Sequence, residues 1–235
     1  MPLADRHQVS TEPRKKSNIM IVDDHPIVRQ GIAQIIERED DMRVCCEAGD
    51  ADQVLEAIAE NENEGCCNAD IVLIDMSLPG ISGIELVKIL RSRFPEIRIL
   101  VISMHDESLY AERALRAGAN GYIMKQETTE KVLNAIRHIL SGEVYVSDKM
   151  RSKILQRIID NRFEIPTSTV SLLSDKEIDV LQLIAKGLKT SDIALELGRS
   201  VKTVEAHRAN LKEKLGLKNA TELVRFAVHW VESES

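Results

Sequence analysis

Residues 71–80 read Ile-Val-Leu-Ile-Asp-Met-Ser-Leu-Pro-Gly, and this stretch decides the fold. Four apolar residues run directly into the carboxylate of Asp75, and Pro79-Gly80 then signals a turn. The pattern predicts a buried strand over Ile71–Asp75 that ends on the acid. Because open α/β sheets bind ligands at the carboxyl ends of their strands, Asp75 is expected to lie at a binding edge.

Four more short apolar runs accompany this one, and helical patterns separate them. The predicted strands are Ile19–Val22, Met42–Glu47, Ile71–Asp75, Ile97–Ser103 and Tyr122–Met124. The predicted helices are one from Pro26, then Asp52–Glu60, Ile84–Arg93, Ser108–Ala117 and one after Thr128 or Thr129. Strands that alternate with helices predict an α/β fold, in which a parallel sheet carries helices on both faces.

The length and the charge distribution predict two domains. The chain has 235 residues, is 43% apolar and has a formal net charge of −7. From Val170 onward, however, ten Lys or Arg residues balance ten Asp or Glu residues, so the excess acid lies in the earlier part. We predict a flexible tail over 1–17, a first domain over 18–140, a linker with helical content over 141–168 and a second domain over 169–235.

The four cysteines form two adjacent pairs, Cys45-Cys46 and Cys66-Cys67. Neither pair has the two-residue gap of a zinc knuckle, so we expect free thiols without a metal or redox role. No apolar run reaches the length of a membrane span, and the first 17 residues are polar. We therefore expect a cytoplasmic protein without a membrane partner.

Chemically useful residues follow four of the predicted strands. Asp23 and Asp24 follow the first, Asp75 ends the third, Ser103 ends the fourth and Lys125 follows the fifth. Clustered carboxylates suit Mg²⁺, and an aspartate beside such a metal can act as a nucleophile toward phosphorus. The alternative is an acidic cluster that serves solubility, with Lys125 as a solvated surface charge.

Residues 18 to about 140 resemble the receiver domain of bacterial two-component response regulators. The resemblance rests on Val-Asp-Asp-His-Pro at 22–26, Ile-Asp-Met-Ser-Leu-Pro-Gly at 74–80, Val-Ile-Ser-Met-His at 101–105 and Gly-Ala-Asn-Gly-Tyr-Ile-Met-Lys at 118–125. It implies a flavodoxin-like, doubly wound sheet of five parallel strands in the order 2-1-3-4-5.

The resemblance also implies roles for single residues. Asp75 would be the phosphoacceptor. Mg²⁺ would be held by the carboxylates of Asp24 and Asp75, by Asp23 through water and by the backbone carbonyl of Ser77. The switch residues would be Ser103, whose hydroxyl responds to the phosphoryl group, Lys125, which pairs with that group, and Tyr122, whose ring follows the switch.

The second domain reads as a small all-α helix-turn-helix domain. Ser174 and Glu177 have the spacing of a capping box, and the helix that follows ends near Gly187. A short helix begins at Thr190 or Ser191, and a third helix is predicted over Val201–Leu215 before Gly216. A fourth helix opens at Asn219 or Thr221.

The third helix carries the predicted DNA-binding surface. Val204, Leu211 and Leu215 share the core side. Six Lys or Arg residues and two acids lie between positions 199 and 218, a modest basic footprint. Candidate phosphate contacts are Lys202, Thr203, Arg208, Lys212 and Lys214; candidate base contacts are Glu205, Ala206, Ala209 and Asn210; His207 suits packing or phosphate contact. The alternative is a helical interaction module with a solvated basic face.

Residues 169–231 resemble the LuxR-type helix-turn-helix of the NarL/FixJ class. The resemblance rests on Leu-Ser-Asp-Lys-Glu-Ile-Asp-Val-Leu at 173–181, Ala-Lys-Gly-Leu-Lys-Thr-Ser-Asp-Ile-Ala at 185–194, Ser-Val-Lys-Thr-Val-Glu-Ala-His-Arg-Ala-Asn-Leu at 200–211 and Lys-Leu-Gly-Leu at 214–217. The family often has Thr-x-Arg-Glu where this chain has Ser-Asp-Lys-Glu at 174–177, which is a mild departure at the first cap.

The two resemblances together imply a transcription factor that phosphorylation switches, and not an enzyme. Its expected partners are a sensor histidine kinase, double-stranded DNA, RNA polymerase and a second copy of the chain when phosphorylated. One alternative is a DNA-binding regulator that works without phosphorylation. Another is a haloacid-dehalogenase-like phosphatase, but such enzymes carry a second Asp two residues after the nucleophile, where this chain has Ser77.

Overall fold

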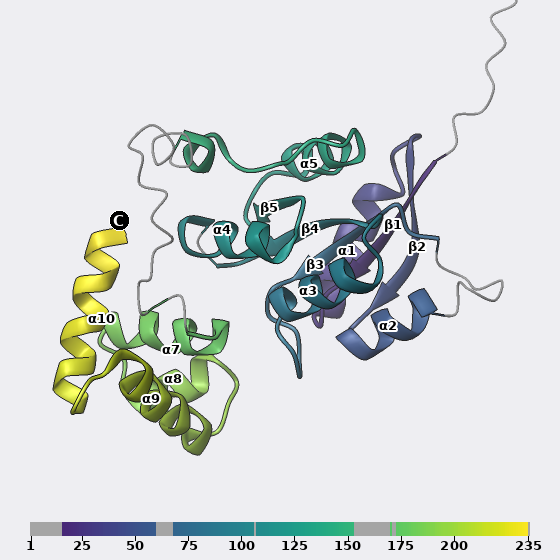
Figure 1. The fold of residues 1–235 in the computed structure, drawn as a ribbon. Coiled ribbons are helices and arrows are strands. Elements are labelled where there is room, and N and C mark those ends of the chain that lie inside the picture. The colour runs from purple at the N-terminus through teal and green to yellow at the C-terminus, as the bar shows by residue number, and fades with distance from the viewer. Residues whose placement is uncertain (1–15, 60–67, 106, 153–169, 171–172, 235) are drawn as a thin grey trace, which may run out of the picture. The chain divides into compact units, whose positions relative to one another are not determined.

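The computed structural model describes residues 16–59, 68–105, 107–152, 170 and 173–234 (Figure 1). The chain divides into two compact units, residues 1–147 and 148–235. The division falls inside the predicted linker. Of the predicted helical content in that linker, residues 148–152 are helical, and the rest lies outside the described residues, as do Cys66, Cys67 and the predicted tail up to residue 15.

The first unit contains a parallel sheet of five strands in the order β2-β1-β3-β4-β5. The strands are β1 (Ser17–Val22), β2 (Met42–Ala48), β3 (Ile71–Asp75), β4 (Arg98–Ser103) and β5 (Gly121–Met124). This is the predicted flavodoxin-like order, and β3 has the predicted bounds. All five residues of β3 are buried, which is expected for the central strand of a sheet covered on both faces.

Helices cover both faces of the sheet (Figure 1). They are α1 (Pro26–Ile36), α2 (Ala51–Ala59), α3 (Gly83–Arg93), α4 (Glu107–Ala117) and α5 (Thr129–Leu140). Apolar residues of α1 and α5 pack with alternate residues of the strands in one core, which includes Ile19, Leu73, Leu100 and Ile136. Contacts of α2 with β2, α3 with β3 and α4 with β5 build the opposite layer.

Four strand ends differ from the predictions by one or two residues, at β1, β2, β4 and β5, and backbone hydrogen bonds explain the differences at β1 and β4. β1 begins at Ser17, inside the predicted tail, and the N–H of Ser17 donates to the carbonyl of Asp41 at 2.9 Å. β4 begins at Arg98 and not at Ile97, because the N–H of Ile97 donates to the carbonyl of Phe94 and closes a turn.

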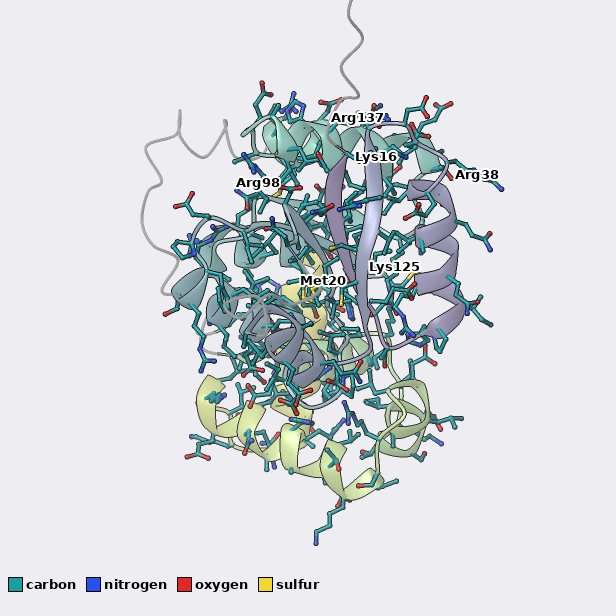
Figure 2. The ribbon with its side chains drawn as sticks, turned by 90° about the vertical axis from the view of Figure 1, so that its right-hand side faces the viewer. Lys16, Met20, Arg38, Arg98, Lys125 and Arg137 are labelled. Atoms are coloured by element: carbon teal, nitrogen blue, oxygen red, sulfur yellow. The ribbon has the colours of Figure 1, made fainter. Side chains whose placement is uncertain are left out.

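The strand register places the predicted site residues at one edge. Val22 pairs with Ile74, so Asp23 follows β1 at the level where Asp75 ends β3. Ser103 pairs with Met124, so Lys125 follows β5 directly beside the end of β4. Figure 2 shows Lys125 away from Lys16 and Arg98, which lie at the opposite ends of the strands. The carboxyl edge of the sheet therefore gathers residues from β1, β3, β4 and β5.

The second unit contains the helices α7 (Asp175–Ala185), α8 (Thr190–Glu196), α9 (Val201–Leu215) and α10 (Ala220–Glu234). Ser174 and Glu177 form the predicted capping box, and α9 has the predicted bounds, with Gly216 left-handed behind it at φ 68°. Asn219 caps α10 by accepting from the N–H of Glu222 at 2.9 Å. Among the described residues, no helix has the length and apolar character to cross a membrane.

Candidate functional site

An acidic pocket at the carboxyl edge of the sheet forms around Lys125. Its amine Nζ lies 2.7 Å from Asp23 Oδ2 and 2.9 Å from Asp75 Oδ2, so one cation joins the ends of β1, β3 and β5. Asp23 and Asp75 are buried, at 2% and 3% exposure. Asp24 is partly exposed at the rim of the pocket. The structure thus brings together the three acids and the lysine that the sequence predicts at this edge.

Burial sets the electrostatics of the pocket. Desolvation raises the pKa of the Asp75 carboxyl, and the Asp23 charge adds to this effect, so the attraction of Lys125 offsets the rise only in part. Burial lowers the pKa of the Lys125 amine, but the hydrogen bond to Asp23 and the charge of Asp75 raise it by more, so the net shift is upward. A second cation in the pocket would relieve the remaining repulsion between the carboxylates.

Two observations indicate that the pocket fits a hard metal ion. Asp23, Asp24, His25 and Asp75 each offer a ligand atom, and these atoms lie within 4.8 Å of one another. Asp75 Oδ2 is buried, and no described residue aligns a hydrogen-bond donor with it beyond the ion pair to Lys125. Carboxylate oxygens in such a cluster are the ligands that Mg²⁺ prefers.

His25 is a pocket residue that the sequence predictions missed. Its Nδ1 lies 2.7 Å from Asp24 Oδ1, and its backbone N–H donates to Asp23 Oδ1 at 2.8 Å. His25 therefore orients both acids of the β1 end. Its position directly after Asp24 is the signal that could have identified it.

Two of the predicted switch residues, Ser103 and Tyr122, meet at His105, in the connection between β4 and α4. Ser103 is buried, and its Oγ accepts from the N–H of His105 at 3.0 Å. Tyr122 is also buried, and its hydroxyl donates to the carbonyl of His105 at 2.9 Å. The imidazole Nε2 of His105 lies 3.0 Å from the hydroxyl of Ser77. This one residue joins the ends of β3, β4 and β5, and sequence spacing gave no sign of it.

On α9 the predicted surface is presented as a helical wheel requires. Val204 and Leu211 are buried and Leu215 is half-buried, whereas most candidate DNA contacts lie on the open side. The exposed ones are Lys202, Thr203, Glu205, Ala206, Ala209 and Asn210; His207, Arg208 and Lys212 are half-buried. Lys214 is also exposed, at 39%, but its amine lies 2.7 Å from the buried carboxylate of Glu177 on α7.

A hollow of about 260 Å³ lies beside this surface. Its lining comes from three helices: Thr190 of α8, Glu205, Arg208, Ala209 and Lys212 of α9, and Ala220 and Leu223 of α10. Thr190 and Ala220 were not among the predicted contacts. Thr190 begins α8 and Ala220 begins α10.

Comparisons with known proteins agree with this geometry. Residues 19–137 match the response regulator receiver domain, and residues 171–227 match the bacterial regulatory proteins of the luxR family. The oxygen regulatory protein NreC of Staphylococcus haemolyticus is 36% identical over 214 residues, which cover 89% of this chain and 96% of NreC.

Two solved structures of RcsB are similar over nearly the whole chain. RcsB from Salmonella enterica serovar Typhimurium, bound to promoter rprA in the presence of the phosphomimetic BeF₃⁻, is 27% identical with a TM-score of 0.56 and covers 91% of this chain and 98% of its own. A structure of two RcsB dimers bound to two parallel DNAs is 26% identical with a TM-score of 0.54 and covers 94% and 100%. With a receiver domain followed by a LuxR-type DNA-binding domain, the chain belongs to the NarL/FixJ class of two-component response regulators, which are DNA-binding transcription regulators.

Proposed function

We propose that Asp75 accepts a phosphoryl group from the phosphohistidine of a sensor kinase and thereby controls DNA binding by α9. The observation that carries this proposal is the Lys125 amine between Asp23 and Asp75, at 2.7 and 2.9 Å. An oxygen of Asp75 would attack phosphorus, the phosphorus–nitrogen bond of the donor would break, and the donor imidazole would leave. Lys125 would then pair with the oxygens of the transferred group.

Mg²⁺ is the metal that we propose for this pocket. Asp24 and Asp75 would hold it through their carboxylates, Asp23 through water and Ser77 through its backbone carbonyl. When bound, the metal would neutralise charge on the phosphoryl group. His25 would keep Asp24 oriented toward it, because its Nδ1 contacts that carboxylate at 2.7 Å.

The phosphoryl group would act on Ser103 and Tyr122. The Ser103 hydroxyl accepts from the N–H of His105 in this structure, so its own proton can be donated to a phosphoryl oxygen. The hydroxyl of Tyr122 donates a hydrogen bond to the carbonyl of the same His105. A shift of Ser103 would therefore also move β5 and the connection to α4. Ser103 and Tyr122 are therefore proposed as the switch pair.

On DNA, the exposed side of α9 would enter the major groove. We propose that Glu205, Ala206, Ala209 and Asn210 contact base edges, and that Lys202, Thr203, Arg208 and Lys212 contact phosphates, with His207 in a packing or phosphate role. Lys214 was also a predicted phosphate contact, but its ion pair with Glu177 favours a role in holding α9.

A homodimer of the phosphorylated protein is the proposed DNA-binding form, and α10 offers a face for it. A hollow of about 680 Å³ along α10 is lined by Leu217, Glu222, Val224, Arg225, Phe226, Val228 and His229. Val224 and Val228 are 40% and 38% exposed, which leaves apolar surface for a second copy. The RcsB dimers on DNA support this assembly. We also propose that the DNA-bound protein contacts RNA polymerase and that the protein is cytoplasmic.

The decisive experiment measures the affinity of the full chain for its DNA with and without beryllofluoride and Mg²⁺, in wild type and in Asp75→Asn. Binding-site selection on random DNA would supply the probe. We expect beryllofluoride to raise the affinity of wild type and to leave the variant unchanged. An unchanged wild type would favour a regulator that works without phosphorylation, and turnover of a small phosphate ester would favour an enzyme.

A further inference from the structure

The chain leaves the first unit through a short segment that lies along the edge strand of the sheet. Residues 143–147, here called the strap, follow α5 and end at the junction between the two units. The N–H of Tyr122 donates to the carbonyl of Tyr145 at 3.0 Å, and the N–H of Tyr145 donates to the carbonyl of Asn120 at 3.0 Å. Gly121 and Tyr145 thus form a parallel bridge, which extends the sheet beyond β5.

The strap lies so close to β5 that a side chain at position 121 has no room. A Cβ atom at Gly121 would come within 2.7 Å of the Tyr145 carbonyl oxygen and 2.8 Å of Ile139 Cδ1. Val146 of the strap is buried, at 7% exposure. At the start of the strap, Glu143 pairs with His138 of α5 at 2.7 Å. The strap is therefore a packed part of the first unit.

A side chain of α4 holds the end of the strap. The N–H of Ser147 donates to Glu107 Oε1 at 2.8 Å, and Glu107 is the first residue of α4. The connection from Ser103 to Glu107 contains His105, which bonds to both Ser103 and Tyr122. The strap thus contacts the switch at two points: the backbone of Tyr122, and the helix that begins where the switch connection ends.

We propose that the strap transmits the phosphorylation state of Asp75 to the second unit, and that phosphorylation releases Ser147 from Glu107. This inference rests on the proposed function. When the Ser103 hydroxyl turns toward a phosphoryl oxygen, its hydrogen bond with His105 changes, and the connection that carries Glu107 shifts with it. The Ser147 N–H then loses Glu107 as its acceptor, and the strap loosens at its last residue, where it leads into the second unit.

Hydrogen exchange of the full chain tests the release directly. In wild type, beryllofluoride with Mg²⁺ is expected to speed amide exchange at Tyr145 and Ser147 about tenfold. Glu107→Ala is expected to show the fast exchange without beryllofluoride, and Glu107→Gln, which keeps an acceptor oxygen, to stay close to wild type. The matched control is Glu112→Ala on the same helix, whose carboxylate pairs with Arg116.

Gly121→Ala provides a second, steric route to the same state, because its methyl group displaces the strap from β5 without replacing a pocket residue. Both Glu107→Ala and Gly121→Ala are expected to raise DNA affinity about tenfold in the absence of beryllofluoride. Titration calorimetry will measure beryllofluoride binding by each variant. Binding as tight as in wild type will show that the pocket is still folded.

The outcomes separate the two proposals. If beryllofluoride raises DNA affinity but leaves exchange of the strap unchanged, or if Glu107→Ala behaves like Glu112→Ala, the strap is not the transmitter, although the proposed function stands. If beryllofluoride binds wild type but changes neither exchange nor DNA affinity, the proposed function fails and the strap inference fails with it.

Discussion

At the scale of single residues, Lys125 sets the charge balance of the pocket. Its amine contacts both Asp23 and Asp75. In Lys125→Met, we expect Mg²⁺ affinity to rise about tenfold, because a cation that repels the metal is removed. Beryllofluoride affinity is expected to fall, because the phosphoryl-like oxygens lose their positive partner. Titration calorimetry measures both.

The control for this prediction is Lys131→Met, which removes an exposed lysine paired with Glu127 one turn away. Such surface pairs contribute little, so both affinities are expected to stay at the wild-type level. If Mg²⁺ affinity falls together with beryllofluoride affinity in Lys125→Met, the main role of Lys125 is to hold the carboxylates of the pocket in place, and its repulsion of the metal is a minor effect.

Asp75 leads to a prediction about stability and pH. Burial raises its pKa above the ordinary 3.8, so the folded state holds the proton more tightly than the unfolded state. Without metal, the stability of the first unit is therefore expected to fall as pH rises from about 4 through the raised pKa. Asp75→Asn removes this dependence and is expected to unfold at a higher temperature than wild type at neutral pH.

Near-ultraviolet circular dichroism of the tyrosines follows this unfolding, because all three tyrosines lie in the first unit. The measurement is made with a chelator present, so that no metal offsets the carboxylate repulsion. An Asp75→Asn variant that unfolds at a lower temperature than wild type at neutral pH would mean that the ion pair with Lys125 outweighs the cost of burying the charge.

The site residues that could be predicted from the sequence are those marked by a pattern in neighbouring residues. Asp23 and Asp75 each end an apolar run. The adjacent residues therefore predict both the strand and the position of its end. His105 carries no such mark. Its contacts reach Ser77 and Tyr122, 28 and 17 residues away, and these pairs become visible only when the strands are in register.

At the scale of elements, the ion pair between Glu177 of α7 and Lys214 of α9 joins these two helices. Glu177 accepts from Lys214 and from the backbone N–H of Ser174, each at 2.7 Å. Burial raises the pKa of Glu177, but these hydrogen bonds lower it by more, so it lies below the ordinary 4.5. The stabilisation is thus fully present above about pH 4.5 and is lost as pH falls through the lowered pKa.

Glu177→Gln is accordingly expected to destabilise the second unit by about 1 kcal/mol at neutral pH, a low value for a charged hydrogen bond because Lys214 is 39% exposed. The difference from wild type should shrink in acid. The single tryptophan, Trp230 on α10, reports this unit by fluorescence. An equal difference at all pH values would mean that the charge of Glu177 contributes nothing.

The same contact separates two lysines of α9 that look alike in the sequence. Both side chains are exposed, but the amine of Lys214 pairs with the carboxylate of Glu177. Lys202→Ala is expected to reduce the slope of log affinity against log salt by about 0.9 in DNA titrations, which corresponds to one lost phosphate contact. Lys214→Ala should leave the slope unchanged. A reduced slope in Lys214→Ala would show that Lys214 contacts a phosphate, as the sequence predicts.

The bounds of β3 and α9 could be predicted because each has a local start and stop. β3 ends on Asp75 before a turn, and α9 lies between Ser200, which caps it, and Gly216, which is left-handed. The strap could not be predicted. Residues 143–147 are as long as β3 but do not alternate between apolar and polar residues, and they lie on β5 because Gly121 leaves space for the Tyr145 backbone.

At the scale of the whole molecule, the two units differ in charge, and this difference agrees with the separate roles proposed for them. The first unit carries the excess acid and the pocket that would bind metal and phosphate. The second has no net charge from Val170 onward, so its attraction to DNA depends on how the basic residues of α9 are presented. In the proposed homodimer, two such units would bind DNA together, so control of dimerisation would also control DNA binding.

The apolar face of α10 makes this dependence on dimers testable. In Val228→Glu, a carboxylate replaces a side chain that is 38% exposed, and burying a charge between two copies would cost its hydration. With beryllofluoride and Mg²⁺ present, we expect binding to a DNA with two half-sites to lose its cooperativity. The matched control is Ile27→Glu, at an 85% exposed position of α1, which should bind like wild type. Because position 228 is remote in sequence from the pocket, beryllofluoride affinity should be unchanged in Val228→Glu. Ile27 lies two residues after His25, so the control is compared with wild type at saturating beryllofluoride. Cooperative binding by Val228→Glu would place the dimer contact elsewhere.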